Sequence, residues 1–264
     1  MRPTLTPKGH GLGWISDLPD QRDYIYEPPT EMLARLPTLK KVDLRPHTRP
    51  VFDQGQLGSC TANALSAAFD FDRAREGKKF MAPSRLFIYW NERDIEGTVT
   101  QDSGARIRDG VKVLVKLGAP PERDWEYDIS KFTEKPPAPA FATAKKNQAL
   151  SYHRIVTPHS DPTRDMLACL AAGYPFVTGI SVYESFESAA ASRTGHIPMP
   201  KRREGLLGGH AILIVGYDAA TRLFTFQNSW GTSWGDKGFG YLPFAYLTSR
   251  GLASDMWLIK TVEV

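Results

Sequence analysis

The chain has 264 residues, 41% of them hydrophobic, which is enough to bury one large core or two smaller ones. Its 33 basic and 29 acidic residues are interspersed, and we interpret the dense basic run Lys201-Arg202-Arg203 as a solvated loop, so we do not expect a nucleic-acid partner. With Cys60 and Cys169 as its two cysteines, the chain can hold neither a disulfide framework nor a multi-cysteine zinc site.

The first ten residues lack the continuous apolar stretch of a signal peptide, and no segment has the length of a membrane span. We therefore expect a cytoplasmic protein with reduced thiols and no membrane partner, with export that needs no cleavable signal as the alternative. The histidines other than His210 lack metal-like spacing to Asp, Glu or Cys, so we expect no metal site and no cofactor.

Residues 1–45 contain many Pro and Gly residues and few periodic apolar positions, which predicts an extended arm instead of a domain. The cluster Gly9-His10-Gly11-Leu12-Gly13 neither follows a strand nor opens a clear helix, so it is a weak candidate for a phosphate-binding loop. Val42–Pro46 is expected to be a short extended segment that leads into the main domain, residues 46–262.

A helical half is predicted at about residues 48–130. Apolar residues at helical spacing predict helices at 61–76, 84–94 and 106–117. The glycine-rich turn before the first helix delivers Cys60 to its start, with Ser59 as the candidate N-cap. A thiol in a first helical turn lies among unpaired backbone N–H groups, which favours the thiolate. The alternative is a cysteine buried as a small hydrophobe.

A β-rich half is predicted at about residues 150–262, after a Pro-rich connection. The expected strands are 151–156, 176–182, 210–217, 223–228, 238–242 and 256–262. Of these, 210–217 and 223–228 form a hairpin. Cys169 falls among the apolar residues of a predicted helix and is interpreted as core filling. Helices followed by strands predict an α+β fold in two halves.

Two polar residues stand out in the β-rich half. His210 opens a nearly continuous apolar run, and Asn228 ends the next strand. A thiol protease needs a thiolate, an imidazole that holds the thiol proton and later passes it to the leaving amine, and a third group that fixes the imidazole tautomer. Cys60, His210 and Asn228 supply these three types, and their wide separation in the chain is typical of a site built across two halves.

On these motifs the sequence resembles the papain-like cysteine peptidases. The motifs are Gln54 six residues before Cys60, Gly58-Ser59-Cys60, His210-Ala211 followed by Val215-Gly216-Tyr217, and Asn228-Ser229-Trp230-Gly231 with Trp234-Gly235. They occur in the order typical of the family. The resemblance implies a papain-like α+β fold, with a helical half and an antiparallel β-barrel-like half on either side of a cleft, and cysteine endopeptidase activity on peptide or protein substrates.

The resemblance also implies residue roles. Cys60 would attack the peptide carbonyl, and His210 would form an ion pair with Cys60 and protonate the leaving amine. Asn228 would orient His210, while the Gln54 side chain and the Cys60 backbone N–H would hold the oxyanion. Four further residues are expected near the substrate: Ser103 and Gly104 along its backbone, Ala211 beside a side-chain pocket, and Trp230 as a shield over the Asn–His hydrogen bond.

The chain departs from the family pattern at Leu57, where the family usually has a cysteine, so the disulfide of the helical half is absent. This fits a reducing compartment or a bacterial branch. The arm at 1–45 resembles the leader of the bacterial xylellain-type branch. We expect the arm to pack along the cleft and limit access, because such a cleft is shaped to receive an extended peptide. The alternative is a disordered or surface-docked tail.

Two other functions stay open. A non-catalytic peptide-binding protein could keep this fold, although it would have no chemical reason to keep Cys60, His210, Asn228 and Gln54 together. A papain-fold acyltransferase or deamidase would use the same thioester, and the acceptor, water or amine, distinguishes it from a peptidase.

Overall fold

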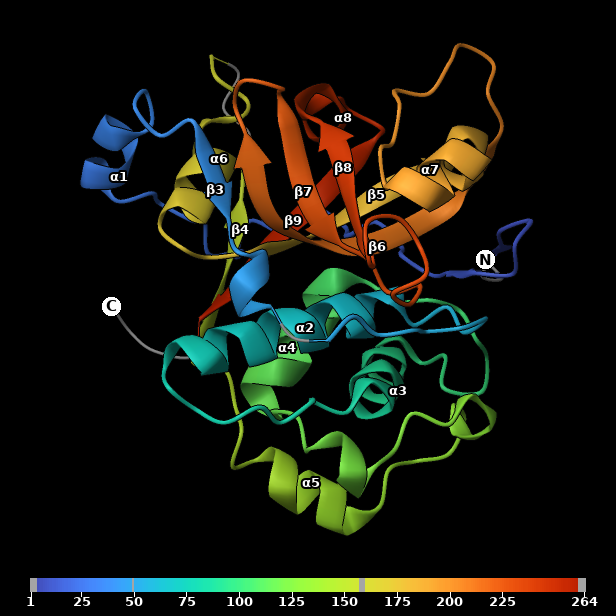
Figure 1. Cartoon of the computed structure of the whole chain (residues 1–264). Coiled ribbons are helices and arrows are strands. Elements are labelled where there is room, and N and C mark those ends of the chain that lie inside the picture. Colours follow the sequence, from blue (N-terminus) through green and yellow to red (C-terminus); the bar gives the residue numbers. More distant parts are fainter. Residues whose placement is uncertain (1–3, 49, 157–159, 261–264) are drawn as a thin grey trace.

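The computed structural model describes residues 4–48, 50–156 and 160–260. In Figure 1, helices α2 to α5 fill the lower half and the antiparallel sheet fills the upper half. The helices are α1 (Thr30–Arg35), α2 (Cys60–Arg75), α3 (Arg85–Glu96), α4 (Ile107–Lys116), α5 (Ala138–Ala144), α6 (Arg164–Ala171), α7 (Ala189–Thr194) and α8 (Phe244–Thr248). The strands are β1 (Thr4–Leu5), β2 (Gly11–Leu12), β3 (Lys41–Asp43), β4 (Ser151–Ile155), β5 (Phe176–Tyr183), β6 (Leu206–Asp218), β7 (Leu223–Gln227), β8 (Phe239–Pro243) and β9 (Ala253–Lys260). The predicted α+β class is confirmed.

The large sheet runs in the order β4-β9-β5-β6-β7-β8, with β3 beside β6, and its strand pairs are antiparallel. The predicted hairpin is confirmed as β6 and β7, which pair over the whole length of β7. Side chains along β6 alternate between two cores. Ile212 and Ile214 pack with residues of α6 and α8, whereas Leu213 and Val215 pack with residues of α2, α3 and α4. The continuous apolar run thus marks a strand that is buried on both faces.

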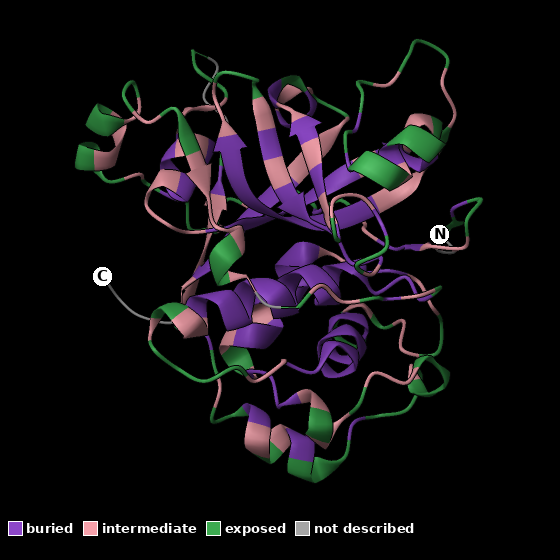
Figure 2. Ribbon diagram, viewed as in Figure 1, coloured by how far each residue is buried: buried purple, intermediate pink, exposed green. Residues whose placement is uncertain are grey.

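Helix α2 is the centre of the molecule, and every residue from Cys60 to Asp72 is buried. Figure 2 shows the buried residues gathered in α2, α3 and the middle of the sheet. Ser84 caps α3 by accepting a hydrogen bond from the Phe87 N–H at 3.2 Å, and Gly97 ends that helix in a left-handed conformation. The three helices predicted in this half begin and end within two residues of the observed bounds.

Ser59 does not cap α2 as predicted, because its side chain makes no capping hydrogen bond. Its hydroxyl instead lies 2.5 Å from the Tyr127 hydroxyl and accepts a hydrogen bond from the Asn63 amide at 3.0 Å. These contacts tie the turn before Cys60 to the body of the helical half.

The described residues of the predicted arm, 4–45, contact the rest of the chain at several points. Leu12 and Tyr26 are 1% and 5% exposed and belong to the core of the β-rich half. The Tyr26 N–H donates to the Arg154 carbonyl of β4 at 2.8 Å. The arm also contains the short helix α1, which its composition did not indicate, and ends in β3, which is part of the large sheet. The extended conformation of the arm is therefore stabilised by contacts with the rest of the chain.

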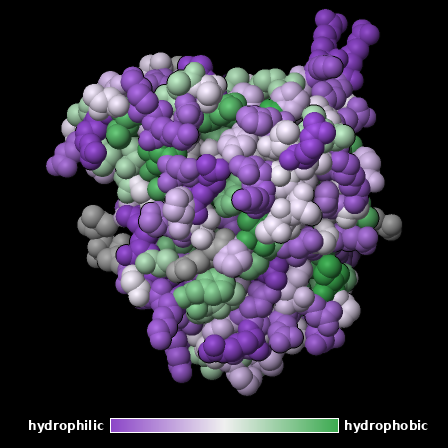
Figure 3. Space-filling model, viewed as in Figure 1, coloured by the Kyte–Doolittle hydropathy of each residue, from purple (hydrophilic) through white to green (hydrophobic). Residues whose placement is uncertain are grey.

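Hydrophilic residues cover most of the face in Figure 3, with apolar groups between them. No helix within the described residues is long and apolar enough to cross a membrane. The run Lys201-Arg202-Arg203 is exposed between α7 and β6, as a solvated loop should be. The last two positions of the final predicted strand, 261 and 262, lie outside the described residues.

Candidate active site

Cys60 is the first residue of α2, and it lies where the helices meet the sheet. The turn that delivers it is held from both ends: Gly55 donates its N–H to Asp53 Oδ1 at 2.9 Å, and the Gly58 N–H lies 3.1 Å from each carboxylate oxygen of Asp102. Gly55 has a φ of 59°, a conformation that glycine adopts without strain. The cysteine side chain is completely buried.

His210 and Asn228 come together because β6 and β7 pair side by side. His210 Nε2 lies 2.8 Å from Asn228 Oδ1. Because an amide oxygen only accepts, Nε2 carries the proton and Nδ1 is left as the acceptor nitrogen. His210 Nδ1 is buried and has no hydrogen-bond partner among the described residues. The Trp230 ring lies beside the imidazole, with 4.8 Å between the ring centroids.

The Gln54 side chain is held rigidly at the same place. Its Oε1 accepts from the Ser229 hydroxyl at 2.6 Å, and its Nε2 donates to the Leu57 carbonyl at 2.8 Å. The same Nε2 donates to the carbonyl of Gly11 in the arm at 3.1 Å. The arm thus satisfies the amide group that the sequence assigned to the oxyanion.

Residues 11–15 of the arm pass directly over this site. The Trp14 N–H donates to the Gly209 carbonyl at 3.0 Å on the sheet side. On the helical side, the Ala105 N–H donates to the Gly13 carbonyl at 2.8 Å, and the Ile15 N–H donates to the Ala105 carbonyl at 3.0 Å. The arm therefore bridges the two halves as an additional extended segment and covers Cys60.

The buried site holds its thiol and imidazole in neutral forms. Burial raises the pKa of Cys60 to about 12, and the backbone N–H groups of Ala211 and Gly13 offset only part of that effect. Burial also lowers the pKa of His210 to about 4, although the hydrogen bond to Asn228 acts in the opposite direction. The prediction that Cys60 is a thiolate is therefore wrong for this arm-covered conformation. The loss of solvation raises the pKa of the thiol by more than the N–H groups of the first helical turn lower it.

A buried carboxyl group lies behind the nucleophile. Glu92 is 0% exposed, and its Oε2 accepts from the Thr61 hydroxyl at 2.9 Å. Burial raises the pKa of Glu92 well above its usual value, and proximity to this carboxyl is one of the causes that raise the pKa of Cys60. A neutral Glu92 is thus the form that suits a thiolate at Cys60.

The residues predicted near the substrate lie around the same cleft, but not all face it as expected. Ser103 turns its hydroxyl to Thr98 at 2.8 Å, and the Gly104 N–H is used by the Tyr89 hydroxyl at 3.1 Å. The next residue, Ala105, makes the backbone hydrogen bonds to the arm. Gly104 instead leaves room for the arm, because a Cβ at this position would lie 2.1 Å from the Gly13 carbonyl oxygen.

Ala211 and Trp230 both lie at the site. Ala211 is 1% exposed and packs in the same core as Cys60. The Trp230 ring contacts two imidazoles. It stacks on His10 of the arm, with 4.3 Å between the ring centroids and 8° between the ring planes, and it also lies against His210. His10 Nδ1 also lies 3.3 Å from Glu187 Oε1.

Sequence reasoning missed several residues of this site. His10 was interpreted only as lacking the spacing of a metal ligand, and Trp14, Asp17 and Asp255 were not singled out. The Asp17 N–H donates to Asp255 Oδ2 at 2.8 Å, and the Asp17 carboxylate accepts from the Trp257 indole at 2.8 Å. The available signal was the glycine-rich stretch around His10, because glycines without side chains allow a backbone to approach another backbone closely.

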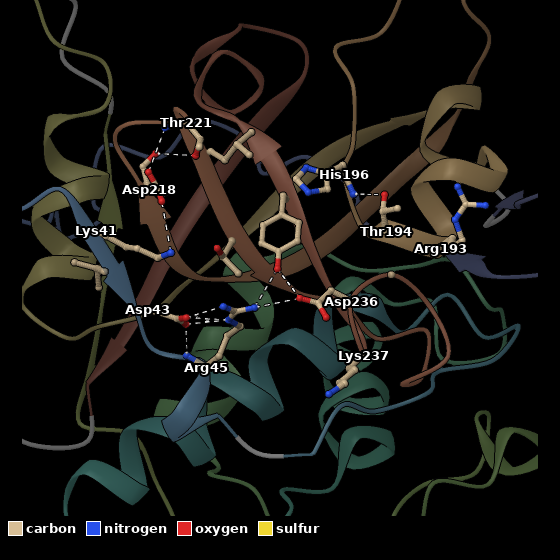
Figure 4. A pocket seen from close by; sticks show the side chains of 15 residues that line it. Lys41, Asp43, Arg45, Arg193, Thr194, His196, Asp218, Thr221, Asp236 and Lys237 are labelled. Atoms are coloured by element: carbon tan, nitrogen blue, oxygen red, sulfur yellow. Dashed lines mark hydrogen bonds and ion pairs between the residues drawn. The ribbon is translucent and has the colours of Figure 1, made fainter.

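A cavity of about 610 Å³ lies over β7 and β8, between β3 and α7 (Figure 4), and Cys60 is not among the residues that line it. The Arg45 side chain projects into it. Its Nη2 lies 2.7 Å from Asp43 Oδ2, and its Nη1 lies 3.3 Å from Asp236 Oδ2 and donates to the Tyr241 hydroxyl at 3.0 Å. The Arg45 guanidinium in this cavity is thus already paired with two carboxylates. Within the described part of the chain, no group of three His, Cys, Asp or Glu side chains could hold a metal ion.

Comparison with known proteins identifies relatives of the whole chain. The family model of papain family cysteine proteases matches residues 38–255. An uncharacterised peptidase C1-like protein of Acanthamoeba polyphaga mimivirus is 38% identical over 270 residues, which cover 95% of this chain and 87% of the viral protein. Peptidase 1 of Psoroptes ovis is 25% identical over 207 residues, 76% of this chain and 59% of that protein.

Solved structures agree. Xylellain, a cysteine protease from Xylella fastidiosa, superposes with a TM-score of 0.88 at 42% identity, covering 100% of this chain and 99% of xylellain. Digestive procathepsin L 3 of Tenebrio molitor shares the fold with a TM-score of 0.66 at 18% identity, covering 84% of this chain and 69% of that chain.

Proposed function

This chain belongs to the papain family of cysteine proteases, and we propose that it is an endopeptidase that acts through a Cys60 acyl-enzyme and is restrained by its own N-terminal arm. The resemblance inferred from the four motifs is confirmed at the level of the family, which acts on peptide bonds. Family membership does not by itself assign the roles of individual residues or of the arm, which are inferred from their contacts.

In the proposed reaction, Cys60 Sγ attacks the carbonyl carbon of the scissile bond while the thiol proton moves to His210 Nδ1. The resulting imidazolium gives this proton to the departing amine as the C–N bond breaks, which leaves a thioester on Cys60. Water then attacks the thioester, and His210 takes a proton from this water and returns it to the thiolate. Asn228 holds the imidazole in place through Nε2 in both steps.

Gln54 is assigned to the oxyanion. Its Nε2 already donates to an arm carbonyl 3.1 Å away, and the Ser229 hydroxyl holds its Oε1 in place. A fixed amide donor of this kind stabilises the negative oxygen of the tetrahedral intermediate without having to reorganise.

The observation that carries this proposal is the unpartnered, buried Nδ1 of His210, together with a completely buried Cys60 whose thiol lies at the backbone N–H of the next residue, Ala211. An imidazole whose Nε2 is fixed by Asn228 and whose Nδ1 is left without a partner is poised to accept a proton. The arm explains why the pair is not ionised here, because it removes water from both groups. Departure of residues 11–15 would expose the pair to water and reverse the effect of burial on both pKa values.

Hydrolysis of fluorogenic dipeptides by the full chain tests the assignment. Cys60→Ala and His210→Ala should abolish turnover, and Gln54→Ala should lower kcat by about 10²–10³. Cys169→Ala, in the core of the β-rich half, is the matched control and should keep its activity. Hydrolysis that survives Cys60→Ala would contradict the proposal. Mass analysis of products formed with an added amine would separate a peptidase, which gives free acid, from an acyltransferase.

A further inference from the structure

One aspartate of the arm joins the two halves of the molecule through two arginines. Asp23 accepts two hydrogen bonds from Arg108 of α4, from Nε to Oδ1 at 2.9 Å and from Nη2 to Oδ2 at 2.6 Å. Its Oδ2 also accepts from Nη1 of Arg154, in β4, at 3.0 Å. Helix α4 belongs to the helical half and β4 to the sheet (Figure 1). The carboxylate is thus bound by two guanidinium groups, one from each half.

The guanidinium of Arg108 makes its hydrogen bonds to the arm. Nε and Nη2 donate to Asp23, and Nη1 donates to the Leu18 carbonyl. Among the described residues outside the arm, the guanidinium contacts the Trp257 ring, with 5.6 Å between Cζ and the ring centroid. Arg108 is nevertheless only 5% exposed. It is therefore a buried cation whose hydrogen-bond acceptors belong to the segment that covers the cleft.

The charges that stabilise this cation also come from the arm. Burial acts to lower the pKa of Arg108, yet the pKa is raised, because Asp23 and Asp17 of the arm favour the charged form. Departure of the arm removes both carboxylates. Arg154 keeps a carboxylate neighbour in Asp255, whose Oδ1 is 3.5 Å from Nη2, whereas Arg108 loses the carboxylate that it binds.

An acidic side chain of a bound peptide can take the place of Asp23. A guanidinium that has lost its partner in a buried site costs free energy, and a new carboxylate recovers it through charge-assisted hydrogen bonds. The planar fork of arginine matches a carboxylate, whereas an uncharged amide gains less. Asp23 and Arg154 also line a cavity of about 360 Å³ together with Arg250, which leaves room for a side chain longer than aspartate.

The two arginines lie within reach of a peptide in the cleft. Gly13 of the arm lies at the Cys60 thiol, and Leu18, which binds Arg108, follows five positions later. Five extended residues span at most about 18 Å. A substrate that continues along the course of the arm therefore brings a side chain to Arg108 from about four to six positions away from the cleaved bond.

We propose that, once the arm has left the cleft, Arg108 and Arg154 form a binding site for an acidic side chain of the substrate, several positions from the cleaved bond. The proposal rests on the proposed peptidase activity and adds a substrate class to it, peptides with an aspartate or glutamate at this distance. Asp23 is then the internal occupant of the site, and its contacts show the chemistry that the site binds.

The test uses the full chain with Asp23→Asn, which removes the internal carboxylate. Quenched fluorescent peptides with a common cleaved sequence carry glutamate, glutamine or lysine at each of the distant positions in turn, on either side of the cleaved bond. At one position, glutamate should lower KM about tenfold relative to glutamine at similar kcat, and lysine should be poorest. Added salt should reduce this preference, because it screens the charges.

Arginine variants in the same background assign the site. Arg108→Gln and Arg154→Gln should each remove most of the preference for glutamate. The Arg154 side chain is 25% exposed, so its replacement keeps the test valid if Arg108→Gln does not fold. Arg123→Gln is the control, because the Arg123 side chain is 84% exposed and lies beside Asp124, and it should leave the preference unchanged.

Equal KM values for glutamate and glutamine at every position would overturn the inference while leaving the peptidase assignment intact. A preference for glutamate that survives both Arg108→Gln and Arg154→Gln would do the same. Hydrolysis of none of these peptides would instead overturn the proposed function.

Discussion

Gly13 of the arm and Gly58 of the nucleophile turn are in backbone contact, because a Cβ on Gly13 would stand 1.8 Å from the Gly58 carbonyl oxygen. Neither side of this contact can yield easily. Gly58 is held by Asp102, and Gly13 is held by Ala105. The absence of a side chain at Gly13 is therefore what lets the arm lie over Cys60.

Replacing Gly13 by alanine should loosen the arm in the full chain. The added methyl group would collide with backbone, which cannot move aside as a flexible side chain can, so residues 11–15 should lift from the cleft. We expect peptide hydrolysis to rise at least tenfold, measured as kcat/KM with a fluorogenic dipeptide. Gly251→Ala is a control that adds backbone strain without a collision: Gly251 has a φ of 86°, and no atom lies within 4 Å of the added Cβ. Equal or lower turnover by folded Gly13→Ala would exclude the arm as a restraint.

The reactivity of Cys60 toward iodoacetamide should report on the arm. With the pKa of the thiol raised to about 12, only about one molecule in ten thousand carries the thiolate at pH 8. Alkylation of the wild type should therefore be slow, and Gly13→Ala should speed it by at least a hundredfold. Cys169, whose pKa burial also raises, should stay unlabelled in both proteins, as mass spectrometry of peptides would show. Rapid labelling of the wild type at neutral pH would contradict the buried, neutral thiol.

Docking of the arm should weaken as the pH rises. Burial and the neighbouring Asp255 raise the pKa of Asp17 from 3.8 to about 6. The docked arm thus holds a proton that the free arm releases, so docking is strongest below about pH 4 and loses at most about 3 kcal/mol as the pH rises through 6. Hydrogen exchange at the Trp14 and Ile15 amides, corrected for intrinsic rates, should show less protection at pH 7.5 than at pH 4.5.

Two variants separate this effect from general changes with pH. Asp17→Asn removes the titrating group and should flatten the pH dependence of protection. Asp20→Asn is the control, because Asp20 pairs with Arg22 within the arm, at 2.8 Å, and should keep the dependence of the wild type. Equal pH dependence in both variants would show that another group controls docking.

The sequence was sufficient for the parts of the site that are encoded locally. Cys60, His210, Asn228 and Gln54 each belong to a short motif, and the apolar run of β6 placed the histidine on a strand buried on both faces. The helices of the helical half could be predicted from apolar spacing. These features were accessible because each depends on residues within a few positions of one another.

The remaining features depend on distant contacts. The surroundings that bury Cys60 include the arm, whose Gly13 N–H lies at the thiol. An argument from the start of a helix cannot include a segment whose position is unknown. Asp255 accepts a hydrogen bond from the arm at a point where β5 and β9 pair with a register shift, and this shift leaves no periodic mark in either strand. Ser59 fits the composition of an N-cap, yet Tyr127 and Asn63 take up its hydroxyl.

Strand β3 anchors the arm into the same sheet that carries His210, so the arm is tethered to the site that it covers. A tethered segment faces its site at an effective concentration of about millimolar or more, whatever the concentration of the protein. Dilution therefore cannot release it, and activation should show first-order kinetics with a half-time that is the same for a nanomolar and a micromolar solution. If activation became faster at higher protein concentration, one molecule would be opening or cutting the arm of another.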